Sequence, residues 1–271
     1  MSSPRSELYR ELRRKPLMFG RSYLAALTEP SRWAYRPWAD QVTFVCGSPH
    51  SGTSVTLRVI GEHPAVYAPM YESEAFLKAM PPWGMLRRLR RETVASGRRV
   101  LVEKTPDHLK HIEHIRRLVP GAQFIITIRD GRDVAASIAH RKHSSSSGVR
   151  RWQAAAAITA REVNAPDVLC LRYEDFVDDP IGYVRRICAF VGIPYLREML
   201  DFHRHPVRYN GRDGKQKGTG VGGDHQRLRS WQINQPIFDG RGRWKHELST
   251  EVAAAFNVGE LGSLMRQFGY S

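Results

Sequence analysis

The amino-acid sequence predicts an α/β fold in which helices cover both faces of a central parallel sheet. Apolar runs typical of buried strands alternate with segments of helical periodicity, and the connections are long enough for parallel pairing. The expected strands are 42–46, 66–68, 100–102, 123–128 and 168–171, and the expected helices are 52–61, 107–118, 134–141, 150–164, 181–191 and 250–268. A further short helix is expected at 7–15, within an irregular lead-in over 1–40.

The segment from Val42 to Gly61 has the clearest local pattern, an apolar strand followed by a glycine loop and a helix. Backbone N–H groups at a helix N-terminus lack intrahelical partners and favour an anion, so this loop is predicted to hold a phosphate. Gly47 and Gly52 have the spacing of a Walker loop, but Thr53 occupies the position of its lysine. The loop is therefore not expected to support ordinary ATP chemistry.

The composition indicates a globular chain that favours an anionic partner. The 271 residues are interpreted as a single domain, and 42 Lys and Arg against 27 Asp and Glu give a net charge of +15. No apolar run approaches the ~18 residues of a membrane span, and the first residues lack an apolar signal-peptide stretch. A cytoplasmic protein without stable membrane insertion is therefore expected. The three cysteines lack paired spacing and are expected to be reduced core residues.

Cations follow two of the predicted strands, at the sheet edge where ligands of open α/β folds bind. Lys104 comes shortly after the strand at 100–102, and Arg129 comes directly after the strand at 123–128. Ser137 lies two turns into the next helix, so it and Arg129 could converge on one anion. These residues are candidates for a binding site.

Simpler structural roles remain open for the same residues. Lys104 could form an ion pair with Glu103 or Asp107, and Arg129 could pair with Asp133 or Glu103. A metal site is not expected from the three nearby histidines, which lack a recognisable ligand motif.

Residues 203–245 form a basic, glycine-rich segment without clean periodicity, and ten Lys or Arg face four acids between 203 and 247. A lid that orders over an anion and a disordered basic surface loop both fit this composition. Two other segments are expected to be peripheral. The run at 144–148 reads as a mobile serine-rich connection, and the basic stretch at 78–99 as a solvated helical face.

Three separated stretches together resemble the sulfotransferases that use 3′-phosphoadenylyl sulfate, PAPS. They are the loop Gly-Ser-Pro-His-Ser-Gly-Thr-Ser at 47–54, Glu-Lys-Thr-Pro at 103–106, and 128–137, where a serine follows an arginine by eight residues. The similarity covers residues 42–195, and a weaker similarity is present at 242–245. Within the superfamily, the chain most resembles tyrosylprotein sulfotransferases and related bacterial enzymes. It implies a P-loop NTPase-like three-layer α/β/α fold, the product PAP and no required metal.

The resemblance also implies which residues bind the donor. The loop would hold the 5′-phosphate through backbone N–H groups and hydroxyls, and Arg129 and Ser137 would bind the 3′-phosphate. Arg141 shares the helix face of Ser137, and Arg243 would close on the 5′-phosphosulfate. The complete expected set is Pro49, His50, Ser51, Gly52, Thr53, Ser54, Arg129, Ser137, Arg141, Tyr173 and Arg243.

Catalytic roles are assigned by the same resemblance. The tyrosylprotein branch has a glutamate base shortly after a His-Pro pair, which here indicates Glu72, one residue later than expected, with Glu74 in reserve. A carboxylate base would need burial to raise its pKa. Lys104 matches the family lysine that stabilises the transferring group. Family loops commonly carry Lys or Arg at the position of His50. His50 could instead act as an acid toward the leaving phosphate or as a second candidate base.

The sequence therefore predicts a PAPS-dependent sulfotransferase that acts on a hydroxyl or amine of a small molecule, carbohydrate, lipid or peptide. A homodimer is left open, and nucleic acid is not an expected partner. The first alternative is a P-loop kinase-like phosphotransferase, which Thr53 in place of the Walker lysine disfavours. The second is a non-enzymatic polyanion or nucleic-acid binding module, which explains the charge but not the ordered motifs.

Overall fold

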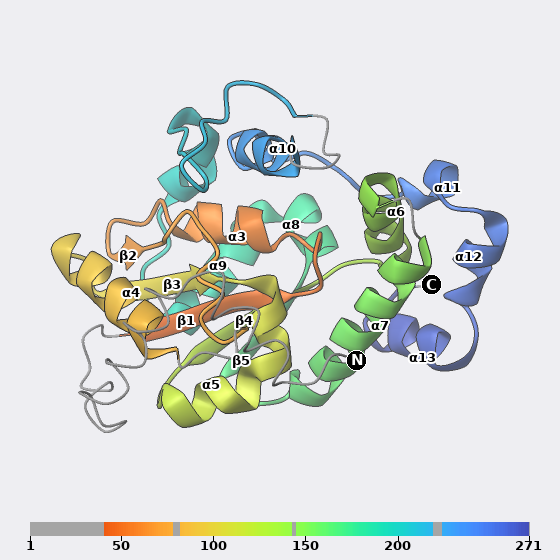
Figure 1. Cartoon of the computed structure of the whole chain (residues 1–271), viewed down its shortest axis with the longest axis horizontal. Coiled ribbons are helices and arrows are strands. Elements are labelled where there is room, and N and C mark those ends of the chain that lie inside the picture. Colours follow the sequence, from red (N-terminus) through yellow and green to blue (C-terminus); the bar gives the residue numbers. More distant parts are fainter. Residues whose placement is uncertain (1–40, 78–81, 143–144, 219–223, 271) are drawn as a thin grey trace, which may run out of the picture.

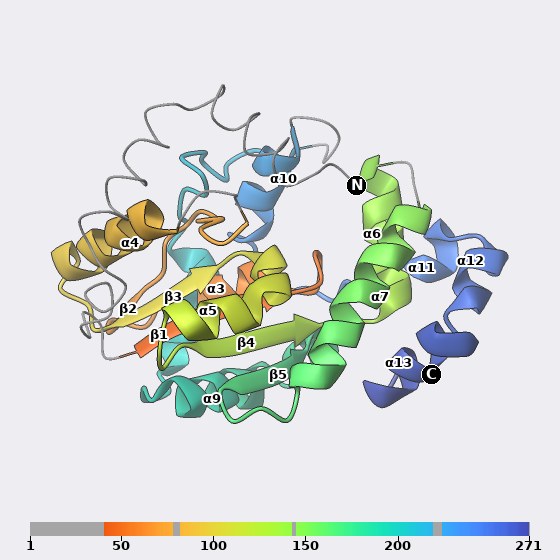
Figure 2. The same ribbon diagram turned by 60° about the horizontal axis from the view of Figure 1, so that its bottom comes forward.

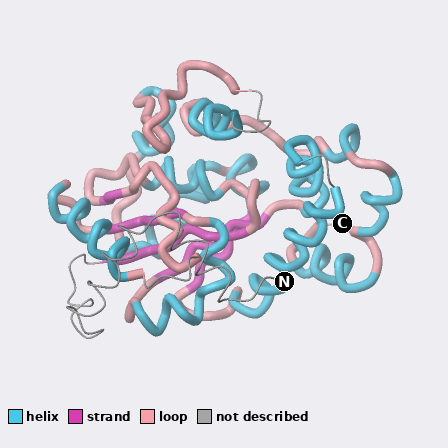
Figure 3. The backbone as a smooth tube through the Cα atoms, in the orientation of Figure 1, coloured by secondary structure: helices cyan, strands magenta, loops and turns pink. Residues whose placement is uncertain are grey.

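The computed structural model describes residues 41–77, 82–142, 145–218 and 224–270, so the lead-in over 1–40 and its predicted helix at 7–15 lie outside the described residues. Five parallel strands form one sheet in the spatial order β2-β3-β1-β4-β5. Their bounds are β1 (Gln41–Gly47), β2 (Val66–Tyr67), β3 (Val100–Lys104), β4 (Gln123–Ile128) and β5 (Val168–Arg172). Every predicted strand is present. Figure 3 shows the strands at the centre of the molecule.

Helices cover both faces of the sheet, which confirms the predicted three-layer arrangement (Figure 2). Side chains alternate along each strand, so Val45 and Phe44 enter cores on opposite faces. The first face packs against α3 (Thr53–Ile60), α8 (Tyr173–Asp178), α9 (Pro180–Val191) and η2 (Arg197–Arg204). The second packs against α4 (Trp83–Ala95), η1 (Pro106–His111), α5 (Ile112–Leu118) and α7 (Ser145–Glu162). The predicted helix at 107–118 is thus a 3₁₀ turn followed by an α-helix.

A third core fixes the end of β4 against the C-terminal helices. It contains residues of α6 (Gly131–Lys142), α7 and α13 (Gly259–Gln267), together with Phe256, which directly follows α12 (Thr250–Ala255). These helices lie together at one end of the molecule (Figure 1). The Trp152 ring is fully buried and meets Phe256 edge to face, with 5.6 Å between ring centroids. Its Nε1 donates to the backbone oxygen of Arg129 at 2.9 Å, so this core positions a predicted site residue.

Two secondary-structure predictions are wrong in detail. The serine-rich run predicted as a loop forms, from residue 145 onward, the first turn of α7. There Gly148 packs so closely on α6 that a Cβ would lie 2.7 Å from Ala135 Cα, and this packing overrides the modest helix propensity of serine. The segment predicted as one helix over 250–268 is divided into α12 and α13, because Val258 is extended and Gly259, the first residue of α13, has a left-handed φ of 57°.

The basic segment over 203–245 is anchored at its start and carries α10 (His225–Gln232) and, at its end, the start of α11 (Trp244–Glu247). Arg58 of α3 is 1% exposed, and its Nη2 donates to the backbone oxygens of Phe202, at 2.6 Å, and His205. In Figure 1, α10 lies above α3. Tyr209 and Gly240 of this segment contact Lys104 at the end of β3 and Arg129 directly after β4, so the described part of the segment lies over the carboxyl edge of the sheet.

The predicted basic helical face within 78–99 is α4, which buries Leu86, Leu89 and Thr93 while the guanidinium of Arg88 is half exposed. None of the helices in the described ranges combines the length and apolar character that a membrane crossing requires.

Gly47, the last residue of β1, is expected to tolerate no side chain. Its φ is 142°, and a Cβ would lie 2.2 Å from the backbone oxygen of Thr127 on β4. Gly47→Ala should therefore lower the free energy of unfolding by about 3 kcal/mol, measured by urea denaturation. Gly97→Ala is the matched control, because Gly97 also has a positive φ but nothing lies within 4 Å of its Cβ position. Equal losses in the two variants would contradict the steric explanation.

Candidate functional site

The loop between β1 and α3 forms one end of the candidate site. Gly52 precedes α3 with a left-handed φ of 97°, and no side chain in the described residues caps this helix. The N–H groups of its first turn can therefore donate to an external anion. His50 has a positive φ of 68°, a conformation that is uncommon for residues with a side chain and persists only when the surroundings impose it.

Ser51 connects this loop to Thr127 of β4. Its side chain is fully buried, and its Oγ lies 2.6 Å from the backbone oxygen of Ser48. The same Oγ lies 2.9 Å from the backbone oxygen of Thr127 and 2.8 Å from Thr127 Oγ1. The structure thus places the Ser51 hydroxyl inside the loop, whereas Thr53 and Ser54 line the adjoining cavity.

Arg129 leaves the carboxyl end of β4 and is 9% exposed. Its guanidinium carbon lies 4.5 Å from the centroid of the Tyr173 ring. Nη1 donates to the His50 backbone oxygen at 3.4 Å, and Nη2 donates to the Gly240 backbone oxygen. The ion pair with Asp133 is present at 3.5 Å, but Nε has no hydrogen-bond partner among the described residues. Arg129 therefore keeps donor capacity for an anion.

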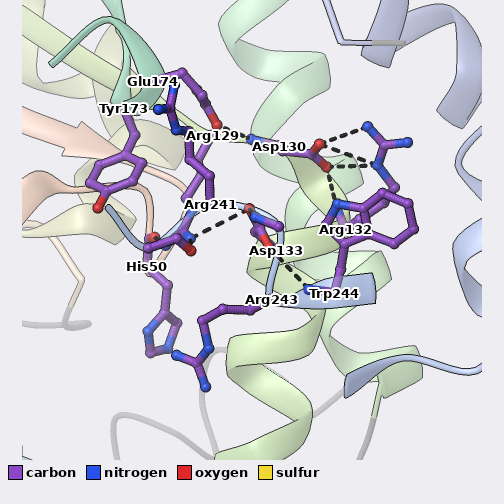
Figure 4. Close-up of polar contacts among 12 residues, drawn as sticks. His50, Arg129, Asp130, Arg132, Asp133, Tyr173, Glu174, Arg241, Arg243 and Trp244 are labelled. Carbon is purple, nitrogen blue, oxygen red and sulfur yellow. Dashed lines mark hydrogen bonds and ion pairs between the residues drawn. The ribbon is translucent and has the colours of Figure 1, made fainter. Parts of the chain in front are cut away.

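Asp133 holds the segment Asp239–Trp244, here called the C-terminal strap, against the site (Figure 4). Its Oδ2 accepts from the N–H of Gly242 at 2.9 Å, and its Oδ1 accepts from the N–H of Trp244 at 3.2 Å. The guanidinium carbon of Arg132 lies 4.4 Å from the centroid of the Trp244 ring. These contacts fix the strap beside Arg129.

The loop, α6, α10 and the strap line a cavity of ≈ 230 Å³. The predicted donor-binding residues in its lining are Pro49, His50, Gly52, Thr53, Ser54, Arg129, Ser137, Tyr173 and Arg243. Arg243 is partly engaged, because its Nε donates to Glu247 Oε1 at 2.9 Å. The side chain of Arg141 lies outside the described part of the structure. The structure thus brings most of the predicted set together.

Glu72 and Lys104 form a pair beside this lining. Lys104 is fully buried, and its Nζ donates to Glu72 Oε1 at 2.7 Å and to Tyr209 Oη at 2.6 Å. Arg229 Nη1 donates to the same Glu72 oxygen at 2.7 Å and also lines the cavity. Lys104 therefore forms its ion pair with Glu72, the predicted base, and the simpler alternative of an ion pair with Glu103 is wrong.

The charges of this cluster oppose the effect of burial on Glu72. Burial raises the pKa of the Glu72 carboxyl, but the charges of Lys104 and Arg229 outweigh burial and hold that pKa below its usual value. Burial lowers the pKa of Lys104 to about 8, with Arg229 acting in the same direction and Glu72 against it. At neutral pH Glu72 is therefore ionised, and Lys104 is mostly cationic.

Glu103 anchors the segment that carries Glu72. It is fully buried, and its Oε1 accepts from the N–H of Ser73 at 3.0 Å and from Thr105 Oγ1 at 2.7 Å. Its Oε2 lies 3.0 Å from His108 Nδ1, so one of the three histidines has a structural partner. Within the described ranges, no group of three or more His, Cys, Asp or Glu side chains is arranged to hold a metal ion.

The sequence did not predict three residues that contact the site, which are Tyr209, Arg229 and Gly240. All three lie in the basic segment at 203–245, where the excess of Lys and Arg was the only signal. Arg229 meets Glu72 across 157 positions of sequence. The charge composition could therefore indicate that the segment at 203–245 contributes to the site, but not that Arg229 contacts Glu72.

Comparisons with known proteins agree with this geometry. Residues 85–197 match the model of the sulfotransferase family. Protein-tyrosine sulfotransferase A of Caenorhabditis elegans is 25% identical over 182 residues, which cover 63% of this chain and 44% of that protein. This chain thus spans less than half the length of that relative.

Two solved sulfotransferase structures have a similar fold. The sulfotransferase domain from the curacin biosynthetic pathway matches with a TM-score of 0.54 and 16% identity, over 85% of this chain and 98% of that chain. Mouse sulfotransferase SULT7A1, complexed with PAP, matches with a TM-score of 0.53 and 17% identity, over 83% of this chain and 85% of that chain. At these identities the likeness supports the fold.

Proposed function

We propose that this chain, of which residues 85–197 match the model of the sulfotransferase family, transfers a sulfuryl group from PAPS to an acceptor hydroxyl or amine and releases PAP. One observation carries the proposal. A helix N-terminus, an incompletely paired arginine and a serine face a single cavity, and a carboxylate–lysine pair lies at its side. The acceptor classes considered are small molecules, carbohydrates, lipids and peptides.

The donor would lie along the cavity with its two anionic ends in separate places. The N–H groups at the start of α3, with Thr53 and Ser54, would hold the 5′-phosphosulfate. Arg129 and Ser137 would bind the 3′-phosphate, because a guanidinium gives charge-assisted bonds and a hydroxyl adds one donor. The similar fold of a sulfotransferase that binds PAP supports this assignment.

Lys104 and Glu72 would act on the transferring group and on the acceptor. The acceptor oxygen or nitrogen forms a bond to sulfur while the bond from sulfur to the bridging phosphate oxygen breaks, and the electron pair leaves with PAP. Glu72 takes the acceptor proton, and the ammonium of Lys104 stabilises negative charge on the sulfuryl oxygens. Positioning and electrostatic stabilisation would supply most of the rate, by analogy with phosphoryl transfer.

Among hydroxyl acceptors, a phenol fits this base better than an aliphatic alcohol. Because Lys104 and Arg229 hold the pKa of Glu72 below its usual value, Glu72 is a weak base and suits an acidic hydroxyl. The name of the C. elegans relative, a protein-tyrosine sulfotransferase, supports the same choice. Rates with a tyrosine-containing peptide, a simple phenol and an aliphatic alcohol under identical PAPS would test it. A faster alcohol would contradict it.

Binding of PAP to the full chain tests the proposed function directly. PAP at 100 times its Kd is expected to stabilise the protein by about 2.7 kcal/mol, observed as a higher midpoint in thermal unfolding. Arg129→Gln should weaken PAP binding about 10- to 100-fold, because it removes charge-assisted hydrogen bonds of about 1.5–3 kcal/mol. Arg204→Gln is the matched control, because its side chain is 71% exposed and lies outside the cavity lining.

Two further ligands separate this proposal from its rivals. Stabilisation by Mg-ATP and not by PAP would favour a phosphotransferase. Stabilisation by an oligonucleotide alone, lost steeply as salt rises, would favour a polyanion-binding module. The absence of any PAP effect on the wild-type chain would contradict the proposed function.

A further inference from the structure

Three donors converge on a single oxygen of Glu72. Lys104 Nζ and Arg229 Nη1 each lie 2.7 Å from Oε1, and Tyr209 Oη lies 3.4 Å from the same atom. The Glu72 side chain is 21% exposed. A carboxylate can accept hydrogen bonds at both oxygens, so this arrangement fixes one oxygen and allows the other to face a ligand.

Tyr209 and Arg229 reach Glu72 as parts of one unit. Ser230, the neighbour of Arg229 on α10, accepts at Oγ from the N–H of Tyr209 at 3.3 Å. Asn234 Nδ2 donates to the backbone oxygen of Val207 at 2.9 Å, and Asn234 Oδ1 accepts from the backbone N–H of Val207 at 2.8 Å. These bonds fasten the chain around Tyr209 to α10. Docking of the unit therefore places both donors together.

Arg229 also belongs to the wall of the cavity proposed for the donor. Leu228 and Gln232, from the same helix, line that wall with it. Its side chain is 24% exposed, so it is neither a free surface arginine nor sealed in the core. One residue of α10 thus connects the cavity with the predicted base.

The groups around Glu72 carry an excess of positive charge. Lys104 from β3 and Arg229 from α10 face one carboxylate, and Tyr209 adds a hydroxyl whose pKa is raised by burial and by Glu72. Glu103, whose charge also acts on Glu72, forms its own hydrogen bonds with Ser73 and Thr105. Glu72 is therefore held more firmly than a single ion pair would hold it.

We propose that Arg229 is a positioning residue for the base: its guanidinium fixes Glu72 through Oε1 and directs Oε2 toward the acceptor. The inference rests on the proposed sulfuryl transfer. Because Arg229 comes from α10, the orientation of the base depends on the packing of α10 beside Glu72 and Lys104. Arg229 acts through Glu72 and is not itself required to contact the acceptor.

Arg229→Gln is expected to lower kcat on the order of 10- to 100-fold, because the carboxylate loses its fixed orientation. The acid limb of the kcat/KM profile should also move up by about one pH unit, because one of two cations near Glu72 is lost. Arg229→Lys should bring the limb back toward the wild-type position, since it keeps the charge. Arg227→Gln, on the same helix with a half-exposed side chain, is the control and should leave both values unchanged.

A ¹³C NMR titration measures the pKa of the Glu72 carboxyl directly, without turnover. The Glu72 signal is assigned as the one that is lost in Glu72→Gln. The Glu72 pKa should rise in Arg229→Gln, and the affinity for PAP should fall much less than kcat, because Arg229 lines the cavity but acts mainly on Glu72. An unmoved titration, or a PAP affinity that falls in proportion to kcat/KM, would overturn the positioning role while the proposed function stands. A wild-type chain that neither binds PAP nor transfers sulfate would instead overturn the proposed function.

Discussion

Replacement of Lys104 by methionine is expected to lower kcat about 100- to 1,000-fold, because it removes the cation proposed to stabilise charge on the sulfuryl group. Lys104 is fully buried and lies at the carboxyl end of β3, so no solvent cation can take its place. Methionine retains most of the side-chain volume. Glu72 keeps its contact with Arg229, which limits the loss of stability.

Steady-state rates and PAP affinity, measured on the same preparation, separate transition-state stabilisation from donor binding. Lys110→Met is the matched control, because Lys110 is 51% exposed and pairs only with Asp107 among the described residues. The wild-type kcat/KM should also fall above pH 8, because burial lowers the pKa of Lys104 to about 8 and only the ammonium carries charge. Persistence of this basic limb in Lys104→Met would assign it to another group.

Replacement of Glu72 by glutamine is expected to lower kcat about 100- to 10,000-fold, the range for loss of a general base. Glutamine is close in shape and can still accept from Lys104 or Arg229, but it cannot take the acceptor proton. The pKa of Glu72 lies below its usual value, so the wild-type base is active at neutral pH and is lost only as the solution becomes acidic. Binding of PAP should be retained, because Glu72 lies outside the cavity lining.

Single-turnover transfer from PAPS, followed by release of PAP, measures this loss without interference from product release. Glu74→Gln is the comparison, since Glu74 is the reserve base from the sequence and is exposed, with a positive φ of 51°. Glu74→Gln should turn over normally. Normal turnover in Glu72→Gln would shift the role to Glu74 or His50 and would contradict the assignment.

The sequence was sufficient where local chemistry decides the structure. Apolar runs alternating with helical segments, and the glycine loop, predicted β1, α3 and the parallel sheet. The spacing of Arg129 and Ser137 predicted two residues of one cavity. These features depend on periodicity, backbone geometry and the common edge of parallel strands. Each can be recognised within a few tens of residues.

The sequence was insufficient where tertiary contacts decide. Nothing near Arg229 indicates that it meets Glu72, because that contact requires α10 to fold back over the sheet. Close packing of Gly148 likewise converted a serine-rich run into the start of α7. The net direction of the Glu72 pKa could not be foreseen either, because two cations from distant segments outweigh burial.

The buried hydroxyl of Ser51 has a thermodynamic consequence for the loop at the start of α3. Because Ser51 ties that loop to Thr127 in the protein alone, the conformational entropy of ordering the loop is lost during folding and not on ligand association. A ligand that enters then meets donors already in place, so its association rate should be governed by diffusion and electrostatic attraction to a chain of net charge +15.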